Sequence, residues 1–343
     1  MESKRALLEV FKLLQPRDVL TACELVSSLW GKAAAHEELW HCFDEDLGLG
    51  YTSTADPKAA YRTAAHCQHY LIYLKSNVLY YYSCLRETFI GSLSLSSPVE
   101  ISTATAIVLL REGSVLLCGG MDYTIEDRTE RIMDSCTRIE VNGTVQPLHS
   151  MLSRRAFPAA IEVKSTLYLF CGFLLTTLST CEKLCLLPIN TLATRLWQPL
   201  PNTLSPRQAC NPCALHSYIY LCGRWNSEQT YERFDTVTET FTVIDVGQAV
   251  GRGVRSSVIY KGQVVVVEAT KLVQFTPETR QTTTQSLPGV FAQSAMNPVL
   301  KGDRLYSLDQ SSGYVYCLSL GVLKSVAVGQ LPAICRFRHY AQG

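Results

Sequence analysis

Arginine is the residue type whose position in this chain points most directly to binding chemistry. Five arginines precede apolar segments that recur along the chain, and a sixth lies near its end: Arg154, Arg155, Arg207, Arg252, Arg255 and Arg338. Their spacing follows the repeat of these segments, so we expect them at equivalent places around one mouth of the fold. Arginine binds carboxylate and phosphate groups in a bidentate manner, so such a ring would suit an acidic or phosphorylated protein segment. The alternative is that each arginine holds loop carbonyl groups inside the fold.

Cysteine and histidine are the residues that could bind a metal. Two pairs of cysteines have spacings that could supply four thiolates to zinc, Cys181-x3-Cys185 and Cys210-x2-Cys213. The second pair straddles the predicted start of a strand, where ligands on alternating faces would not converge. His66 and His69 share one face of a predicted helix, but two ligands do not make a site. We therefore expect no metal and no cofactor.

Signatures of catalysis and of nucleic-acid binding are absent from the sequence. There is no Gly-x-Ser-x-Gly, no phosphate-binding Gly-Lys-Ser/Thr loop and no His-Glu-x-x-His. The formal net charge is +1, and basic residues are not interleaved with aromatic ones. We expect a non-catalytic protein that binds neither nucleic acid nor a membrane surface.

The composition and the cysteine pattern favour a folded protein of the cytoplasm or the nucleus. Apolar residues make up 47% of the chain and charged residues 18%, which is typical of a folded protein and not of a disordered one. We recognise no secretory signal and no run of the ~18 apolar residues that a membrane span needs. Several of the 14 cysteines lie inside apolar strand patterns, including Cys118, Cys171, Cys222 and Cys317. We interpret them as reduced, buried residues of a cytoplasmic or nuclear protein.

An internal repeat organises most of the chain. Its clearest copies are Ser114–Gly120, Thr166–Gly172 and Tyr218–Gly223, and weaker copies follow at Gln263–Glu268 and Arg304–Asp309. The Cys-Gly pairs of the first three copies begin at 118, 171 and 222, about 50 residues apart. A second apolar strand precedes each of these three copies, at Ala104–Leu110, Ala156–Val163 and Ala209–Leu215. Each unit therefore contains about four short strands, which cannot bury both faces alone but can do so by radial stacking.

The period, strand number and glycine placement of this repeat resemble those of kelch repeats, the ~50-residue blades of a β-propeller. The resemblance implies a mainly β fold, a kelch-type propeller of six blades over residues 77–343. We count five copies. A sixth blade would close the ring by combining strands at Val78–Tyr82 and Thr88–Leu95 with a C-terminal strand near Ala333–Tyr340, which would remove the free edges.

The first ~70 residues have helical periodicity instead. Leu7, Val10, Phe11 and Leu14 fall on one face of a helix, which Pro16 interrupts. Asp56-Pro57 then predicts the start of a helix that continues to about Tyr70. We expect a helical domain at residues 1–45 and a helical linker at 46–76.

The helical domain resembles an F-box. The matching residues are Leu8-Glu-Val-Phe11, Leu14, Pro16-Arg-Asp-Val-Leu20, Val26 with Trp30, and Leu39-Trp40. The resemblance implies binding to the small adaptor subunit of cullin–RING ubiquitin ligases. The residues implied to contact this adaptor are Leu8, Phe11, Leu14, Pro16, Leu20, Val26 and Trp30. The alternative is that these apolar residues form the core of a helical cap packed on the propeller.

An F-box followed by kelch repeats implies the substrate-recognition subunit of an SCF-type E3 ubiquitin ligase. Its expected partners are the adaptor, a cullin and an unknown protein substrate, which the loops of one propeller face would recruit. The six arginines above are the candidate substrate contacts, and Tyr123 and Trp225 are candidate aromatic anchors. The alternative function is a protein-interaction scaffold without a ligase. It is favoured by Glu2-Ser3, which stand where the family usually has Leu-Pro.

Overall fold

The computed structural model describes most of the chain between residues 70 and 330. The gaps inside that range are 76, 85–86, 98, 100–103, 111–112, 125–128, 187–195, 224–230, 245–255, 269–270, 278, 280, 288–298, 302, 309–313 and 321–323. The predicted helical domain, most of the predicted linker and the predicted strand at Ala333–Tyr340 lie outside the described residues. The same is true of every predicted adaptor contact from Leu8 to Trp30.

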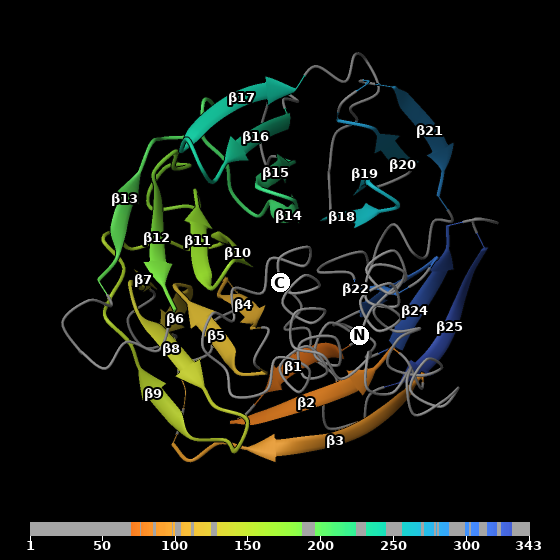
Figure 1. Ribbon diagram of the computed structural model, residues 1–343. Helices are drawn as coiled ribbons and strands as arrows, with labels where there is room; N and C mark the ends of the chain where they lie inside the picture. Colours follow the sequence, from red (N-terminus) through yellow and green to blue (C-terminus); the bar gives the residue numbers. More distant parts are fainter. Residues whose placement is uncertain are drawn as a thin grey trace, which may run out of the picture.

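Within the described residues, the strands form six antiparallel sheets arranged as blades around a central axis (Figure 1). Blade 1 has β1 (Tyr70–Lys75), β2 (Val78–Ser83) and β3 (Thr88–Ser94). Blade 2 has β4 (Ala106–Leu109), β5 (Val115–Cys118), β8 (Cys136–Ile139) and β9 (Val145–Pro147). A separate hairpin, β6 (Met121–Thr124) and β7 (Thr129–Ile132), is inserted between β5 and β8.

The other four blades each have four strands in sequence order. Blade 3 has β10 (Ala159–Val163), β11 (Thr166–Phe170), β12 (Cys181–Cys185) and β13 (Gln198–Leu200), and blade 4 has β14 (Asn211–Leu215), β15 (Tyr218–Cys222), β16 (Tyr231–Asp235) and β17 (Thr240–Ile244). Blade 5 has β18 (Ser256–Tyr260), β19 (Gln263–Val267), β20 (Lys271–Phe275) and β21 (Thr282–Ser286), and blade 6 has β22 (Val299–Lys301), β23 (Arg304–Leu308), β24 (Tyr314–Ser319) and β25 (Lys324–Gln330). The predicted mainly β fold with six blades is confirmed.

The predicted boundary between linker and propeller needs a correction. Residues 70–75 were expected to close the helical linker of 46–76, whereas they form β1 and pair with β2 from Tyr70 opposite Ser83 to Lys75 opposite Val78. The propeller therefore begins at Tyr70 instead of 77. The local pattern of a short run of aromatic and aliphatic residues is compatible with either a helix or a strand. Here the run forms a strand because it pairs with β2.

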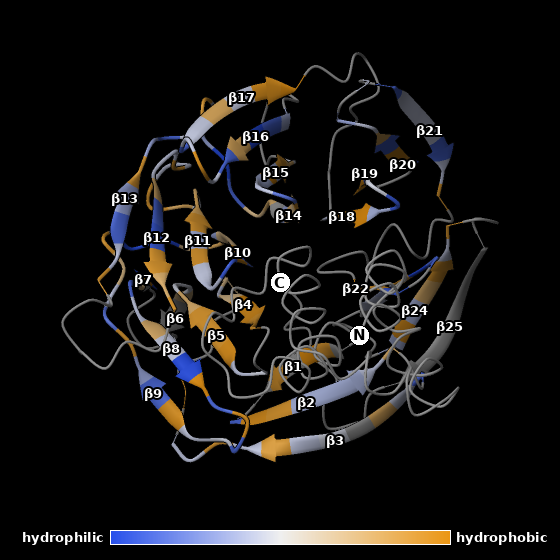
Figure 2. Ribbon diagram, viewed as in Figure 1, coloured by the Kyte–Doolittle hydropathy of each residue, from blue (hydrophilic) through white to orange (hydrophobic). Residues whose placement is uncertain are grey.

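The core lies between blades, and each of six apolar clusters among the described residues joins two neighbouring blades. Phe170 of blade 3 packs edge-on against Phe234 of blade 4, for example, with 5.6 Å between the ring centroids. Hydropathy follows this arrangement, because β5, the second strand from the axis in blade 2, is apolar whereas β21 at the rim of blade 5 is hydrophilic (Figure 2). A ring of this kind adds blades instead of enlarging one core.

Contacts between blades 1 and 6 close the ring. Tyr82 and Cys84 share an apolar cluster with Tyr306 and Cys317. Beside it, Glu87 Oε1 accepts hydrogen bonds from Arg304 Nη1 at 2.7 Å and from the Tyr306 hydroxyl at 2.8 Å. Residues more than 200 positions apart in sequence therefore meet at this seam.

The predicted burial of four cysteines is confirmed. Cys118, Cys171, Cys222 and Cys317 are buried, and none of the ten cysteines in the described part of the chain forms a disulfide. The part of the chain that the structure describes contains no helical segment with the length and hydropathy of a membrane span.

Tight two-residue turns join the first two strands of several blades. In blade 3, Val163 pairs with Thr166, so Lys164 and Ser165 alone form the turn, with φ angles of 49° and 54°. In blade 5, Lys261 and Gly262 form the equivalent turn, with φ angles of 49° and 73°. Two successive positive φ angles are typical of a type I′ turn, which matches the twist of the flanking strands. Glycine adopts this conformation without the steric penalty of other L-residues.

Changing exposed Lys164 to glycine should therefore stabilise the protein. Relief of a left-handed conformation that costs about 1–2 kcal/mol, less the greater entropy that glycine loses on folding, gives an expected gain of about 0.5–1 kcal/mol in the free energy of unfolding. Urea denaturation of the two proteins measures this difference.

The matched control is Gly262→Ser, because a Cβ added at Gly262 would meet nothing within 4 Å and only the backbone conformation is tested. This variant should lose a similar free energy. A loss of stability in Lys164→Gly would contradict the prediction.

Candidate functional site

Three loop segments around blade 3 lie on one side of the ring. They are the connection from β9 to β10 (148–158), the connection from β11 to β12 (171–180) and the connection from β13 to β14 (201–210). Strand direction alternates within a blade, so these connections emerge on the side opposite to the turns that join the third strand to the fourth. We call the three segments together the blade 3 face.

Backbone hydrogen bonds fasten these three segments to one another. Ala156 and Phe173 exchange two N–H···O bonds of 2.8 Å, and Arg207 N donates to Leu178 O at 2.9 Å. The middle segment is thereby held between the other two. The N–H of Phe157 also donates to Ala104 O, and the N–H of Ala209 donates to Phe157 O, so the inter-blade loops are linked in series.

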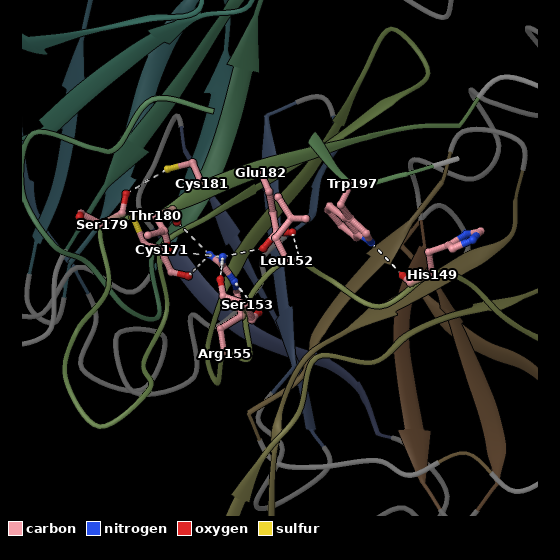
Figure 3. Close-up of polar contacts among 10 residues, drawn as sticks. All are labelled: His149, Leu152, Ser153, Arg155, Cys171, Ser179, Thr180, Cys181, Glu182 and Trp197. Carbon is pink, nitrogen blue, oxygen red and sulfur yellow. Dashed lines mark hydrogen bonds and ion pairs between the residues drawn. The ribbon is translucent and has the colours of Figure 1, made fainter. Parts of the chain in front are cut away.

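The Arg155 side chain is wholly used inside this face (Figure 3). Its Nη1 donates to the carbonyl oxygens of Cys171 at 2.7 Å and Thr180 at 2.8 Å. Its Nη2 lies 2.6 Å from Glu182 Oε1 and donates to Ser153 Oγ at 2.6 Å. Only 1% of the Arg155 side chain is exposed.

Arg207 repeats this arrangement one blade further on. Its Nη1 donates to Gly223 O at 2.9 Å, and its Nη2 lies 2.6 Å from Glu232 Oε1, with both side chains fully buried. Because a charge taken out of water needs a partner and hydrogen bonds, each arginine comes with a buried glutamate on the third strand of its blade.

The backbones of the two arginines are bonded to the preceding blade. Gly120 N donates to Arg155 O at 2.9 Å, and Gly172 N donates to Arg207 O at 2.9 Å. Each arginine therefore joins one blade through its backbone to the next through its guanidinium group. A Cβ placed on Gly119 would lie 2.3 Å from Arg155 O, which explains why a glycine follows Cys118 in the repeat.

The glutamates also position the loops. Glu182 Oε2 accepts the N–H of Leu152 at 2.7 Å (Figure 3), and Glu232 accepts the N–H groups of Leu204 at 2.9 Å and Ser205 at 3.0 Å. Burial raises the pKa of the Glu182 carboxyl, and the Leu152 N–H and the Arg155 charge lower it only in part. The Trp197 indole N–H donates to His149 O at 2.9 Å and fixes the start of the same loop.

The predicted arginine ring is therefore corrected for two of its members. Arg155 and Arg207 are internal and hold loop carbonyls, which was the alternative interpretation, so they are not substrate contacts. Arg154 points outward, with 63% of its side chain exposed and Asp134 Oδ2 3.8 Å from its Nε. The remaining candidates, Arg252, Arg255 and Arg338, lie outside the described residues, as does Trp225. Tyr123 lies in β6 of the inserted hairpin.

Exposed leucines are the feature of this face that sequence reasoning missed. Leu152 and Leu204 are each 57% exposed, and Leu175 is 88% exposed. Leu152 and Leu204 both begin a Leu-Ser-x-Arg sequence, at 152–155 and 204–207. This local repeat is the signal that could have identified them, because each leucine stands three residues before a buried arginine.

A metal centre finds no support in the described part of the chain, where no group of three or more His, Cys, Asp or Glu side chains could hold an ion. The cysteines considered as zinc ligands are Cys181 and Cys185 in β12, Cys210 immediately before β14, and Cys213 within β14. All but Cys185 are buried.

Comparison with known proteins does not assign a family. No family model matches the chain, and no curated protein matches it. Among solved structures, the chain is similar to one titled "Structure of YjhT", with 12% sequence identity and a TM-score of 0.45 over 54% of this chain and 68% of that one. The propeller is thus established by the strand pairing and the inter-blade clusters described above.

Removing one member of a buried ion pair should destabilise the protein strongly. We expect Arg155→Met to lower the free energy of unfolding by about 3–5 kcal/mol, because Glu182 is left buried without its partner. The double variant Arg155→Met with Glu182→Leu should recover part of this loss, but not all of it, since two carbonyl groups also lose their donor. Urea denaturation of the four proteins in this cycle is the measurement. Arg154→Met is the matched control and should change stability by less than about 0.5 kcal/mol.

The loss of unfolding free energy in Arg155→Met should also depend on pH. A carboxyl whose folded pKa lies above its unfolded value of about 4.3 binds more protons folded than unfolded between the two values, so stability falls as pH rises through that interval. Loss of the guanidinium raises the pKa of Glu182 further. The stability gap between wild type and variant should therefore be smallest near pH 4 and widen towards neutral pH. A gap that is constant with pH would contradict the assigned role of Glu182.

Proposed function

We propose that the protein is the substrate-recognition subunit of an SCF-type cullin–RING E3 ubiquitin ligase, whose propeller binds a protein substrate. The β-propeller by itself suggests a protein-interaction scaffold. The observation that carries a binding role is the blade 3 face, where leucine side chains stand in solvent on loops that buried ion pairs hold in place. Exposed apolar groups on a fixed framework are typical of protein-binding surfaces.

The link to ubiquitin transfer is supported by the F-box resemblance of residues 8–40. In this proposal, Leu8, Phe11, Pro16 and Leu20 contribute to a surface that the adaptor covers. The propeller would then hold substrate lysines near the charged conjugating enzyme and raise their effective concentration. The chain itself forms no covalent bond and needs no cofactor, and the proposed complex acts in the cytoplasm or the nucleus.

Co-purification of the full chain with the adaptor and cullin tests the proposal. We expect wild type to retain both partners, and Leu8→Asp combined with Pro16→Ala to lose them, because a buried carboxylate and a lost turn residue disrupt an apolar helical contact. Leu175→Asn, on the propeller, is the control and should retain both partners.

A wild-type chain that fails to bind the adaptor, or a double variant that binds equally well, would overturn the ligase role. The second candidate function, a scaffold without a ligase, would then be favoured by a stable complex that lacks ligase subunits. Glu2-Ser3 at the usual Leu-Pro positions is the feature of the chain that points to this second candidate.

A further inference from the structure

We infer that the blade 3 face binds a peptide segment that combines apolar side chains with Asp or Glu. The inference rests on the proposed function only in that the propeller binds a protein; it does not depend on the ligase. The proposed surface consists of exposed Leu152, Leu175 and Leu204, with exposed Arg154 on the same loop as Leu152.

The three exposed leucines lie on neighbouring loops. Leu152 and Leu204 occupy equivalent positions in successive inter-blade loops, where their N–H groups bind Glu182 and Glu232. Leu175 lies at the tip of a tight hairpin in which Leu174 N donates to Thr176 O at 3.0 Å. The bonds of Phe173 to Ala156 and of Leu178 to Arg207 hold that hairpin between the two loops. The three leucines therefore lie on loop segments that backbone hydrogen bonds join to one another.

Leu175 has a left-handed backbone conformation. Its φ angle is 65°, in the left-handed region that L-residues other than Asn, Asp and Gly seldom adopt. Its side chain is also 88% exposed, so packing within the chain does little to offset this backbone conformation or the exposure of an apolar group. A strained and exposed residue at a loop tip is the kind of outlier that accompanies function.

Hydrogen bonds and ion pairs hold the loops of Leu152 and Leu204 in place. The loop of Leu152 is fixed by the Trp197–His149 bond at its start and by the Arg155–Glu182 pair at its end. The loop of Leu204 is fixed by the Arg207–Glu232 pair. A surface whose backbone is already ordered loses little entropy on binding, which suits capture of a short extended segment.

The charged residues of the face determine which peptide it would bind. The segments 148–158, 171–180 and 201–210 contain no Asp or Glu. Of their arginines, Arg155 and Arg207 are neutralised internally, and Arg154 is exposed. Asp134 lies near Arg154, but an exposed pair at 3.8 Å contributes little. The face therefore presents apolar groups and a cation to a ligand, and a carboxylate on the ligand meets no carboxylate on these segments.

The opposite side of the ring has the contrasting character. Exposed Val141 follows Glu140 in the β8–β9 turn. Exposed Val237 lies between Asp235 and Glu239 in the β16–β17 turn, where Val237 N donates to Asp235 Oδ1. Glu140 pairs with Arg138 and Glu239 pairs with Lys183. These turns therefore carry carboxylates beside their apolar groups, which the three segments of the blade 3 face do not, and they provide controls.

A phage-displayed library of random 12-residue peptides, selected on the full-length chain, is the probe. We expect enrichment of peptides with two or more apolar residues and a neighbouring Asp or Glu. Affinity of one labelled enriched peptide should fall about tenfold or more in Leu175→Asn. It should fall several-fold in Arg154→Glu, with a weaker dependence on salt. Val237→Asn should leave the affinity unchanged.

The Leu175→Asn variant separates binding from folding. Asparagine tolerates a positive φ better than leucine, so the melting temperature of the variant should equal or exceed that of wild type while its peptide affinity falls. The inference is overturned if no peptide is enriched, if enriched peptides lack acidic residues, or if Val237→Asn weakens binding as much as Leu175→Asn.

The ligase proposal fails separately from this inference. Adaptor co-purification of the same variants reports on the ligase alone, since none of them touches residues 1–45. Loss of the adaptor with intact peptide binding removes the ligase role and leaves the acidic-peptide surface standing. The converse result removes the surface and leaves the ligase role.

Discussion

Two arginine side chains are buried with their positive charges inside this propeller. The loops around them supply the carboxylates and carbonyl oxygens that a buried guanidinium group requires. A buried guanidinium group is tolerated only with a carboxylate partner and acceptors for its remaining N–H groups. Arg155 and Arg207 obtain these from Glu182 and Glu232 and from loop carbonyls of the following blade. Because their backbones bond to the preceding blade, the same requirement determines how neighbouring blades are joined.

Most of the loop face follows from this one requirement. The glutamates accept the N–H groups of Leu152 and Leu204, so the exposed leucines are held by the charges buried beneath them. The glycine after Cys118 is needed because Arg155 O approaches too closely for any side chain. The arginines thus support a binding surface without belonging to it, and Arg154 remains as the cation on these segments that faces outward.

The ring explains how a chain of 343 residues folds around no single large core. Each blade is too thin to bury both faces, and the apolar clusters between neighbours supply the missing cover. The seam between blades 1 and 6 uses the same kind of cluster with an added contact from Glu87 to Arg304 and Tyr306. Closure there brings together residues that are far apart in sequence, so the fold is complete only when the last blade meets the first.

The residue pattern alone predicted the first two strands of the clearest repeats, their period of about 50 residues, a ring of six blades and the burial of Cys118, Cys171, Cys222 and Cys317. These features follow from local alternation, turn residues and periodicity, which do not depend on distant parts of the chain. The start of the propeller at Tyr70 was not predicted, because a short apolar run has no preferred state until it finds a pairing partner. The β6–β7 hairpin was not predicted, because its strands are mostly polar and lack an apolar pattern.

The packing of neighbouring blades decides which arginine is buried and which is exposed. Arg154 and Arg155 are adjacent and chemically identical, yet one is in solvent and the other is paired with Glu182, which lies 27 residues further along the chain. The same holds for Leu175, whose exposure and positive φ depend on a hairpin held between two loops. Burial, pairing and exposure are properties of the packed environment, and that environment exists only once the neighbouring blades have come together.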